Sequence, residues 1–275
     1  MSLCQIHKDI EEEVIDFSAH VQSAGEESIT DYLFWRWALA NRKYSHFTAK
    51  TFTKFQESRV TGADFEMEIW FVGKSFSLPL AIQAKKISIE HNSYRKAFSY
   101  PDYTKQQIQK LLSYARNNKR VPLYMFYSQS ALCPHSKTPD CGVYIASALD
   151  IEKFTNLPKG SALPKTKILD RCIHFYELFC DLSQKNIAKK NSVQNIVEVL
   201  TESLAKKSAL TDELIKQIES CKTEVIPNYV QLILNSDQQS IDGDKKLAQE
   251  IEKMKKSDTE IEPRKIIVVD TRLKY

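Results

Sequence analysis

The chain has 275 residues and 42% of them are hydrophobic, which is enough for one sizeable core or for one core with an appended subdomain. It contains no uninterrupted apolar run near the ~18 residues of a membrane span, and acids occupy the N-terminal stretch where a signal peptide would be apolar. We therefore expect a cytoplasmic protein without a membrane partner, while the net charge of +4 is too small to indicate nucleic-acid binding by itself.

Two helices are predicted at the start of the chain. Charged and apolar residues alternate at helical spacing from about residue 6 to residue 24, and Gly25 follows as a natural helix stop. Ser28 or Thr30 then begins a second helix, whose apolar residues form a broad surface. We expect this second helix to be well buried.

Three strands, a helix and a fourth strand are predicted next. The periodicity changes around Phe52, residues 65–72 alternate strictly, and residues 78–87 form a short run typical of a central strand. Residues 102–118 then have helical periodicity, and residues 121–128 are strongly apolar. The order is helix, strand, strand, strand, helix, strand.

The remainder of the chain is predicted to be mostly helical. This pattern runs from about residue 167 to residue 256, and residues 265–273 are a possible final strand. We divide the chain into an N-terminal helix (1–25), a core (26–150) and a mainly helical extension packed on that core (151–275).

Polar residues stand at particular strand ends. Asp64 starts the second strand, Gln83 and Lys85 lie near the end of the third, and the intervening length suits a hairpin that brings these ends together. Because side chains alternate along a strand, Gln83 and Lys85 share one face, as do Asp64, Glu66 and Glu68. We expect one of these faces to be polar for a functional reason.

Hydrolysis of a phosphodiester is one such reason. A divalent cation held by carboxylate and carbonyl oxygens polarises a phosphoryl oxygen and lowers the pKa of a bound water. A nearby ammonium can orient that water or balance charge on the phosphate. Asp64, Gln83 and Lys85 supply these groups, but with one negative charge fewer than two carboxylates, so a further acid is needed.

The stretches "GAD" (62–64) and "QAK" (83–85), separated by a short hairpin, resemble the PD-(D/E)xK restriction-endonuclease-like superfamily in the QxK variant of Mrr-type nucleases. The resemblance implies an α/β fold with an αβββαβ core and a mixed central sheet flanked by helices. It implies that Asp64 and Gln83 bind metal and that Lys85 is the catalytic lysine. It also implies a Glu on the first core helix, for which Glu27 is the best match by position and Glu57 the competitor.

This sequence departs from the family pattern in one place, because Ala63-Asp64 replaces the Pro-Asp dipeptide, which removes specificity from the match. The chain also resembles an uncharacterised bacterial domain family over about two thirds of its length. The shared stretches are "ESITD", "ESRVTGADFE", "AIQAKK", "QQIQKLLSYA", "VPLYMFYS" and "HFYELFCD". This second resemblance implies the fold rather than a reaction.

The predicted function is therefore Mg²⁺- or Mn²⁺-dependent hydrolysis of nucleic acid, with DNA favoured over RNA and a role in defence against foreign DNA implied by the resemblance alone. Glu27, Glu57 or Glu66 would add the missing negative charge. One alternative is an inactive nuclease fold that binds nucleic acid, and another is a protein-interaction module that uses the helical C-terminal half. A homodimer is left open.

Further residues are candidate nucleic-acid contacts. Lys86 projects opposite to Lys85 and fits a phosphate contact or plain solvation, with solvation favoured. Gln107 and Lys105 lie on the helix after the Gln-Ala-Lys strand, where they would face either the site or solvent. Tyr124 and Tyr127 are better explained by core packing than by base stacking.

The six cysteines favour reduced thiols over a disulfide framework in a long chain of cytosolic character. Two C-x-H-x₅-C patterns, residues 133–141 and 172–180, carry enough ligands for zinc if they meet in space. Their spacing matches no recognised finger, and Cys172 and Cys180 stand among apolar residues. Buried thiols are the favoured interpretation.

Overall fold

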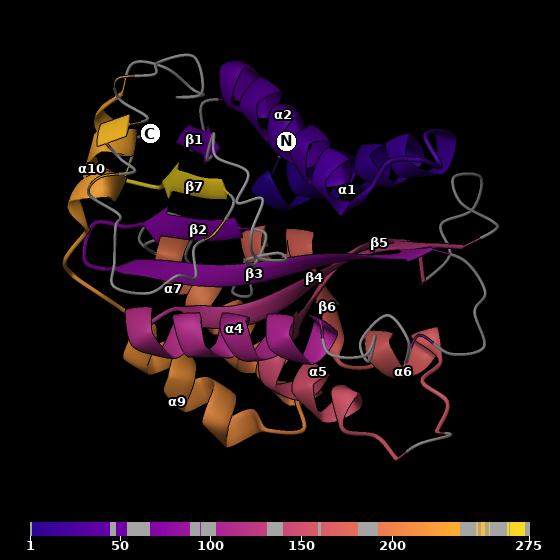
Figure 1. The fold of residues 1–275 in the computed structure, drawn as a ribbon. Coiled ribbons are helices and arrows are strands. Elements are labelled where there is room, and N and C mark those ends of the chain that lie inside the picture. Colours follow the sequence, from indigo (N-terminus) through magenta and orange to yellow (C-terminus); the bar gives the residue numbers. More distant parts are fainter. Residues whose placement is uncertain are drawn as a thin grey trace.

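A computed structural model gives the fold of the chain. It describes residues 2–44, 48–53, 67–88, 94, 103–130, 140–158, 161–180, 192–236, 246, 249–250, 253, 263 and 265–272. Within these ranges helices and strands both occur in the N-terminal and the C-terminal half of the chain (Figure 1).

The described strands are β1 (Thr48–Thr53), β2 (Met67–Val72), β3 (Ser77–Ser88), β4 (Val121–Gln129), β5 (Gly142–Ser147), β6 (Cys172–His174) and β7 (Lys265–Asp270). The helices are α1 (Leu3–His20), α2 (Glu26–Tyr44), α4 (Tyr103–Asn118), α5 (Ala148–Thr155), α6 (Lys165–Leu169), α7 (Ser192–Glu198), α8 (Ala205–Lys207), α9 (Thr211–Cys221) and α10 (Asn228–Asn235). A 3₁₀ helix, η1 (Phe175–Phe179), and a π-helical stretch, η2 (Val199–Leu204), complete them.

All the described strands join one mixed, seven-stranded sheet in the order β1-β7-β2-β3-β4-β5-β6. The pair β2–β3 is an antiparallel hairpin, whereas β3–β4 is parallel, with α4 as the crossover. The C-terminal strand β7 runs parallel to β2 and antiparallel to β1. The end of β3 and the starts of β2 and β7 therefore lie at the same end of the sheet.

Helices cover both faces of the sheet, with α1 and α2 on one side and α4 and α5 on the other (Figure 1). Ile82 and Leu123 pack with the α1–α2 side, together with apolar residues of α7, η2 and α9. Ala81, Tyr124 and Phe126 pack with the α4–α5 side. Burial on both faces explains why the central strands read as nearly continuous apolar runs.

The order helix, strand, strand, strand, helix, strand is observed from α2 to β4, and the final strand is present as β7. The expected α/β class is confirmed in its broader form, a mixed sheet flanked by helices. The second helix starts at Glu26, before the expected Ser28 or Thr30. Tyr124 and Tyr127 are fully buried, as core packing requires.

Residues 151–275 contribute β6 and β7 to the same sheet as residues 26–150. Strand β7 is inserted between β1 and β2, so two strands consecutive in the chain are not neighbours. Long-range pairing of this kind leaves no local periodicity that would reveal it. No helix among the described segments is long and apolar enough to cross a membrane.

Candidate functional site at the end of strand β3

The Gln-Ala-Lys stretch lies near the end of β3, where the strand continues beyond its described pairing with β2. Met67 pairs with Ile82, and toward β4 Gln83 pairs with Tyr124 and Lys85 with Phe126. Tyr124 and Phe126 belong to the α4–α5 side. Gln83 and Lys85 therefore share that face, as the strand period predicted.

Gln83 is buried, with 5% of its surface exposed. Its side-chain Nε2 donates a hydrogen bond to the carbonyl of Ala84 at 3.1 Å. Its Oε1 is buried and accepts no hydrogen bond within the described structure. A buried carbonyl oxygen without a partner carries a desolvation cost of roughly 1–3 kcal/mol, so this atom is suited to a ligand such as a cation.

Lys85 is half-buried beside Gln83. None of the interactions described for this structure engages its ammonium group, whereas the ammonium of the neighbouring Lys86 donates to two carbonyls within the chain. The positive charge of Lys85 is therefore not neutralised by a described carboxylate. It remains available to an anionic ligand on the same strand face as the Gln83 oxygen.

Lys86 points to the opposite face, toward α1 and α2. Its Nζ donates to the carbonyls of Gln22 and Ala24, both at 3.1 Å, and its backbone N–H donates to Oε1 of Glu26 at 3.1 Å. Burial lowers the pKa of Lys86, while Glu26 acts in the opposite direction. The ammonium of Lys86 is therefore anchored within the chain, a role that the sequence did not indicate.

Glu27 is exposed in the first turn of α2, in the layer opposite to Gln83 and Lys85. That turn nevertheless lies at the same end of the sheet, because Glu26 contacts Lys86 of β3. One turn further along α2, Asp31 forms an ion pair with Lys265, the first residue of β7. The start of α2 therefore crosses the end of the sheet where the Gln-Ala-Lys stretch lies.

Three of the predicted site residues, Asp64, Glu57 and Glu66, fall outside the described residues. Within the described part of the chain, no group of three or more His, Cys, Asp or Glu side chains is arranged to hold a metal ion. Gln107 lies half-buried on α4, and Lys105 lies on the same helix with its side chain outside the description.

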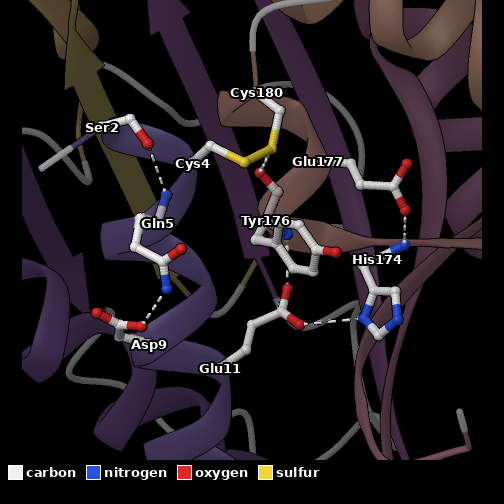
Figure 2. Close-up of a disulfide and its surroundings, with 9 residues drawn as sticks. All are labelled: Ser2, Cys4, Gln5, Asp9, Glu11, His174, Tyr176, Glu177 and Cys180. Carbon is white, nitrogen blue, oxygen red and sulfur yellow. Dashed lines mark hydrogen bonds and ion pairs between the residues drawn. A yellow bond between two sulfur atoms is a disulfide. The ribbon is translucent and has the colours of Figure 1, made fainter.

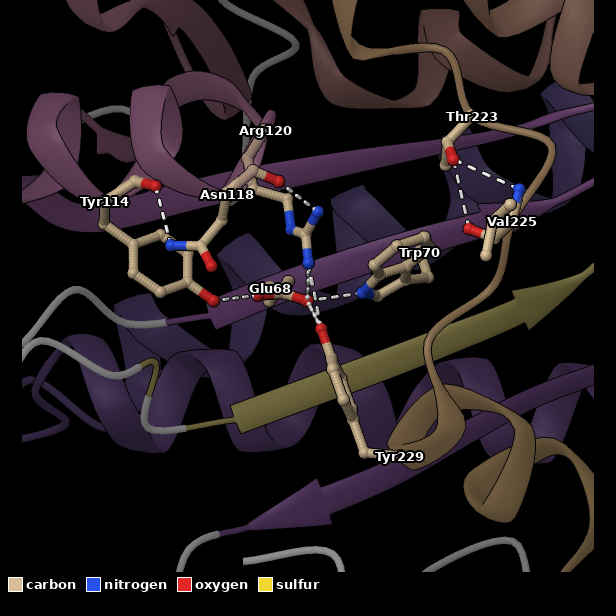
Figure 3. A network of polar contacts seen from close by, with 8 residues as sticks. All are labelled: Glu68, Trp70, Tyr114, Asn118, Arg120, Thr223, Val225 and Tyr229. Carbon is tan, nitrogen blue, oxygen red and sulfur yellow. Dashed lines mark hydrogen bonds and ion pairs between the residues drawn. The ribbon is translucent and has the colours of Figure 1, made fainter. Parts of the chain in front are cut away.

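Glu68 of β2 occupies a buried polar cluster that the sequence only hinted at (Figure 3). It shares the sheet face of Gln83, and its carboxylate accepts hydrogen bonds from the Tyr114 hydroxyl, the Trp70 indole and the Tyr229 hydroxyl, the last at 2.6 Å. The Arg120 guanidinium lies 3.4 Å away as its ion-pair partner. The polar face of β2 therefore has a structural role at this position.

The charges in this cluster support one another. Burial alone, the largest single effect, would lower the pKa of the Arg120 guanidinium, but the Glu68 carboxylate together with Tyr229 and Tyr114 outweighs it, and the pKa is raised. Burial, and next the Glu68 charge, raise the pKa values of Tyr114 and Tyr229, so both phenols remain protonated donors. The sequence signal that could have identified this cluster is an acid inside an otherwise apolar strand.

The expectation of reduced thiols was wrong for three of the described cysteines. A disulfide joins Cys4 at the start of α1 to Cys180 after η1 (Figure 2). Cys141 is disulfide-bonded as well. Sulfur atoms in disulfides are not the thiolate ligands that zinc requires. Cys172 and Cys221 are free and buried, as expected for structural thiols.

A second contact stabilises the same region. The buried Glu11 carboxylate on α1 accepts a hydrogen bond from the backbone N–H of Tyr176 at 2.6 Å and lies 3.3 Å from Nδ1 of His174 (Figure 2). Burial raises the pKa of Glu11, although His174 opposes this. His174 therefore has a packing role in place of a zinc ligand.

Comparison with protein families finds that the model of a family of unknown function, DUF6615, matches residues 3–272. No curated protein and no solved structure matches the chain.

Proposed function

The chain belongs to DUF6615, a family of unknown function, and we propose that it hydrolyses phosphodiester bonds in nucleic acid with the help of a divalent cation. The observation that carries this proposal is the buried, unpartnered Oε1 of Gln83 on the same strand face as the ammonium of Lys85. A buried acceptor without a partner in the described structure is destabilising, so a cation bound by Gln83 Oε1 would relieve that cost.

The donor set fits a hard cation such as Mg²⁺ or Mn²⁺, which prefers oxygen ligands. Gln83 supplies an amide oxygen. Asp64 lies three residues before Met67, and Met67 pairs with Ile82, the residue beside Gln83. Three residues span at most about 11 Å when extended, so the length of the chain allows Asp64 to approach Gln83. When bound, such a cation would polarise the phosphoryl oxygen and lower the pKa of an attacking water.

The remaining catalytic roles belong to different side chains. Lys85 would hold the attacking water or balance the negative charge that develops on the phosphate. Asp64 supplies one negative charge, and Glu27 is the favoured source of a second because its helix starts at the same end of the sheet. Glu57 and Glu66 are the alternatives for this acid.

The proposal also covers fold and substrate. We assign the α2-to-β4 segment to the restriction-endonuclease-like superfamily, supported by its αβββαβ element order and by the β2–β3 hairpin. DNA is the favoured substrate and defence against foreign DNA the favoured role, both on the resemblance alone. Gln107 and Lys105 of α4 are candidates for contacts with the substrate backbone.

The test uses plasmid DNA and a single-stranded oligonucleotide with Mn²⁺ or Mg²⁺. Lys85→Ala should reduce cleavage about a hundredfold or more, as loss of one group that stabilises transition-state charge does. Lys74→Ala is the matched control, because Lys74 is an exposed lysine in the turn before β3. Undiminished cleavage by Lys85→Ala would remove the proposal.

A metal-binding measurement separates an active site from an inactive relative of the fold. Binding of Mn²⁺ that Asp64→Asn abolishes supports a working site. Retained DNA binding without Mn²⁺ binding or cleavage would favour the inactive nucleic-acid-binding module. Absence of Mn²⁺ binding, of DNA binding and of cleavage would favour the protein-interaction module.

A further inference from the structure

Lys86 makes more contacts than a solvated or phosphate-binding lysine would. Its ammonium donates to two carbonyls, those of Gln22 and Ala24, in the turn that joins α1 to α2. Its backbone N–H donates to Glu26 at the start of α2 instead of to a strand. One residue thus connects the end of β3 to the turn and to the first residue of the next helix.

These contacts involve two pairs of chain neighbours. Glu26 and Lys86 are bonded to each other, and the residues beside them, Glu27 and Lys85, are the acid and the ammonium of the proposed site. Adjacent residues are about 3.8 Å apart at Cα. The hydrogen bond from the Lys86 backbone N–H to the Glu26 carboxylate therefore restricts the separation of Glu27 from Lys85. It involves the side chain of neither Glu27 nor Lys85.

The rest of α2 is anchored independently. The Thr30 hydroxyl is hydrogen-bonded to the Tyr127 hydroxyl of β4 at 2.7 Å, and Asp31 pairs with Lys265 of β7. Both anchors lie at least one turn beyond Glu26. Removing the Lys86 ammonium should therefore loosen residues 22–27, because only the bond from the Lys86 backbone N–H to Glu26 then holds them to the end of β3, and leave the body of the helix in place.

We propose that Lys86 is a positioning residue, which fixes the α1–α2 turn and the first turn of α2 against β3 and so sets Glu27 relative to Lys85. The roles of Glu27 and Lys85 rest on the proposed function. The clamp, by which we mean the hydrogen bonds of Lys86 to Gln22, Ala24 and Glu26, rests on the contacts alone.

The experiment compares Lys86→Met, which keeps most of the side-chain stem without the ammonium, with Lys86→Arg, which keeps a cationic donor. Lys74→Met is the control for the same substitution at an exposed lysine. Native-state hydrogen exchange is followed at the amides of Ala24, Ile29 and Lys86, each of which has a hydrogen-bonded N–H. Amides in the middle of α4 provide the internal reference.

Exchange at these amides should be about tenfold faster in Lys86→Met, as expected for lost hydrogen bonds to a charged group. It should return toward wild type in Lys86→Arg and be unchanged in Lys74→Met. Affinity for Mn²⁺ alone and kcat on plasmid DNA should fall about tenfold in Lys86→Met, with KM for DNA unchanged. A phosphate contact would instead raise KM and weaken its salt dependence.

The outcomes are separable. Wild-type exchange in Lys86→Met would overturn the clamp, and faster exchange with unchanged Mn²⁺ affinity and kcat would overturn the positioning role. If wild-type protein neither binds Mn²⁺ nor cleaves nucleic acid, the proposed function fails and the positioning role fails with it. The exchange result would still decide whether the clamp exists.

Discussion

The Glu68 carboxylate on β2 and the Arg120 guanidinium before β4 lie 3.4 Å apart in the protein interior. Arg120 also stacks over the Trp70 ring, 4.4 Å from its centroid, and donates to the Tyr229 hydroxyl of α10 at 3.0 Å. This buried ion pair and its contacts thus connect β2, the start of β4 and α10. The pair fixes how these three elements pack.

Breaking this pair from one side should be strongly destabilising. Arg120→Met leaves the Glu68 charge buried without its cation, so we expect the free energy of unfolding to fall by about 3–5 kcal/mol. Urea denaturation at pH 7 measures this. Glu219→Gln is the control, because Glu219 pairs with Lys222 at the surface, where an ion pair contributes about 1 kcal/mol or less.

The double variant Glu68→Gln with Arg120→Met gives the coupling energy of the pair. It should be less destabilised than the sum of the two single variants, because no unpaired charge remains. Strict additivity would show that the two groups do not interact.

The Cys4–Cys180 disulfide should contribute to stability through the unfolded chain. It closes a loop with a sequence separation of 176 residues. In the chain-entropy model, a loop of this length gives up to about 5 kcal/mol. We expect Cys4→Ser to lower the free energy of unfolding by about 2–5 kcal/mol, measured in urea without reductant.

The double variant Cys4→Ser with Cys180→Ser is the control, and it should be no less stable than the single variant because both lack the same bond. Alkylation of unfolded, unreduced wild-type protein followed by mass spectrometry checks the premise. Labelling of Cys4 under those conditions would contradict it.

His7 should make the protein less stable in acid. Burial lowers the pKa of His7 to about 3, below the value of about 6.5 in an unfolded chain. The unfolded state then binds the extra proton between these two pH values, so stability is complete above about pH 6.5 and is lost as the pH falls toward 3. Between pH 7.5 and pH 4.5 the loss from this group is about 3 kcal/mol.

His7→Phe isolates the effect, because Phe keeps a ring against Phe179, whose centroid lies 3.5 Å from that of His7. The free energy of unfolding is compared for both proteins at pH 7.5 and pH 4.5. The wild type should lose about 3 kcal/mol more than the variant. Equal losses would mean that His7 titrates normally in the folded protein.

Gly142 should tolerate no side chain. An added Cβ would lie 2.8 Å from Cε1 of His174 and 3.2 Å from Cε2 of Tyr144, so the His174 ring, which contacts Glu11, would have to shift. We expect Gly142→Ala to be destabilising by about 1–3 kcal/mol in thermal or urea unfolding.

Gly25→Ala is the matched control, because a Cβ at Gly25 meets nothing within 4 Å. It should leave stability within about 0.5 kcal/mol of wild type. A neutral result for Gly142→Ala would show that the His174 ring moves freely and that its contact with Glu11 contributes little.

The end of β3 at Gln83 shows which features the alternation of side chains along a strand can predict. Alternation along β3 predicts that Gln83 and Lys85 share a face and that Lys86 takes the other, and the structure agrees on all three. Alternation also placed Glu68 on a polar face, but it could not identify Arg120 and Tyr229 as partners. Those residues are 52 and 161 positions away along the chain.

The sequence by itself determined the order of helices and strands from α2 to β4 and the final strand β7, because burial imposes a period of two or 3.6 residues along each segment. It did not indicate β5, or β6 within the stretch expected to be helical. Only the tertiary structure decided that β7 enters the middle of the sheet, that Cys4 meets Cys180 and that Lys86 bonds the start of α2. Each of these depends on segments far apart in the chain that share no local signal. Their contact becomes favourable only once the whole core is packed.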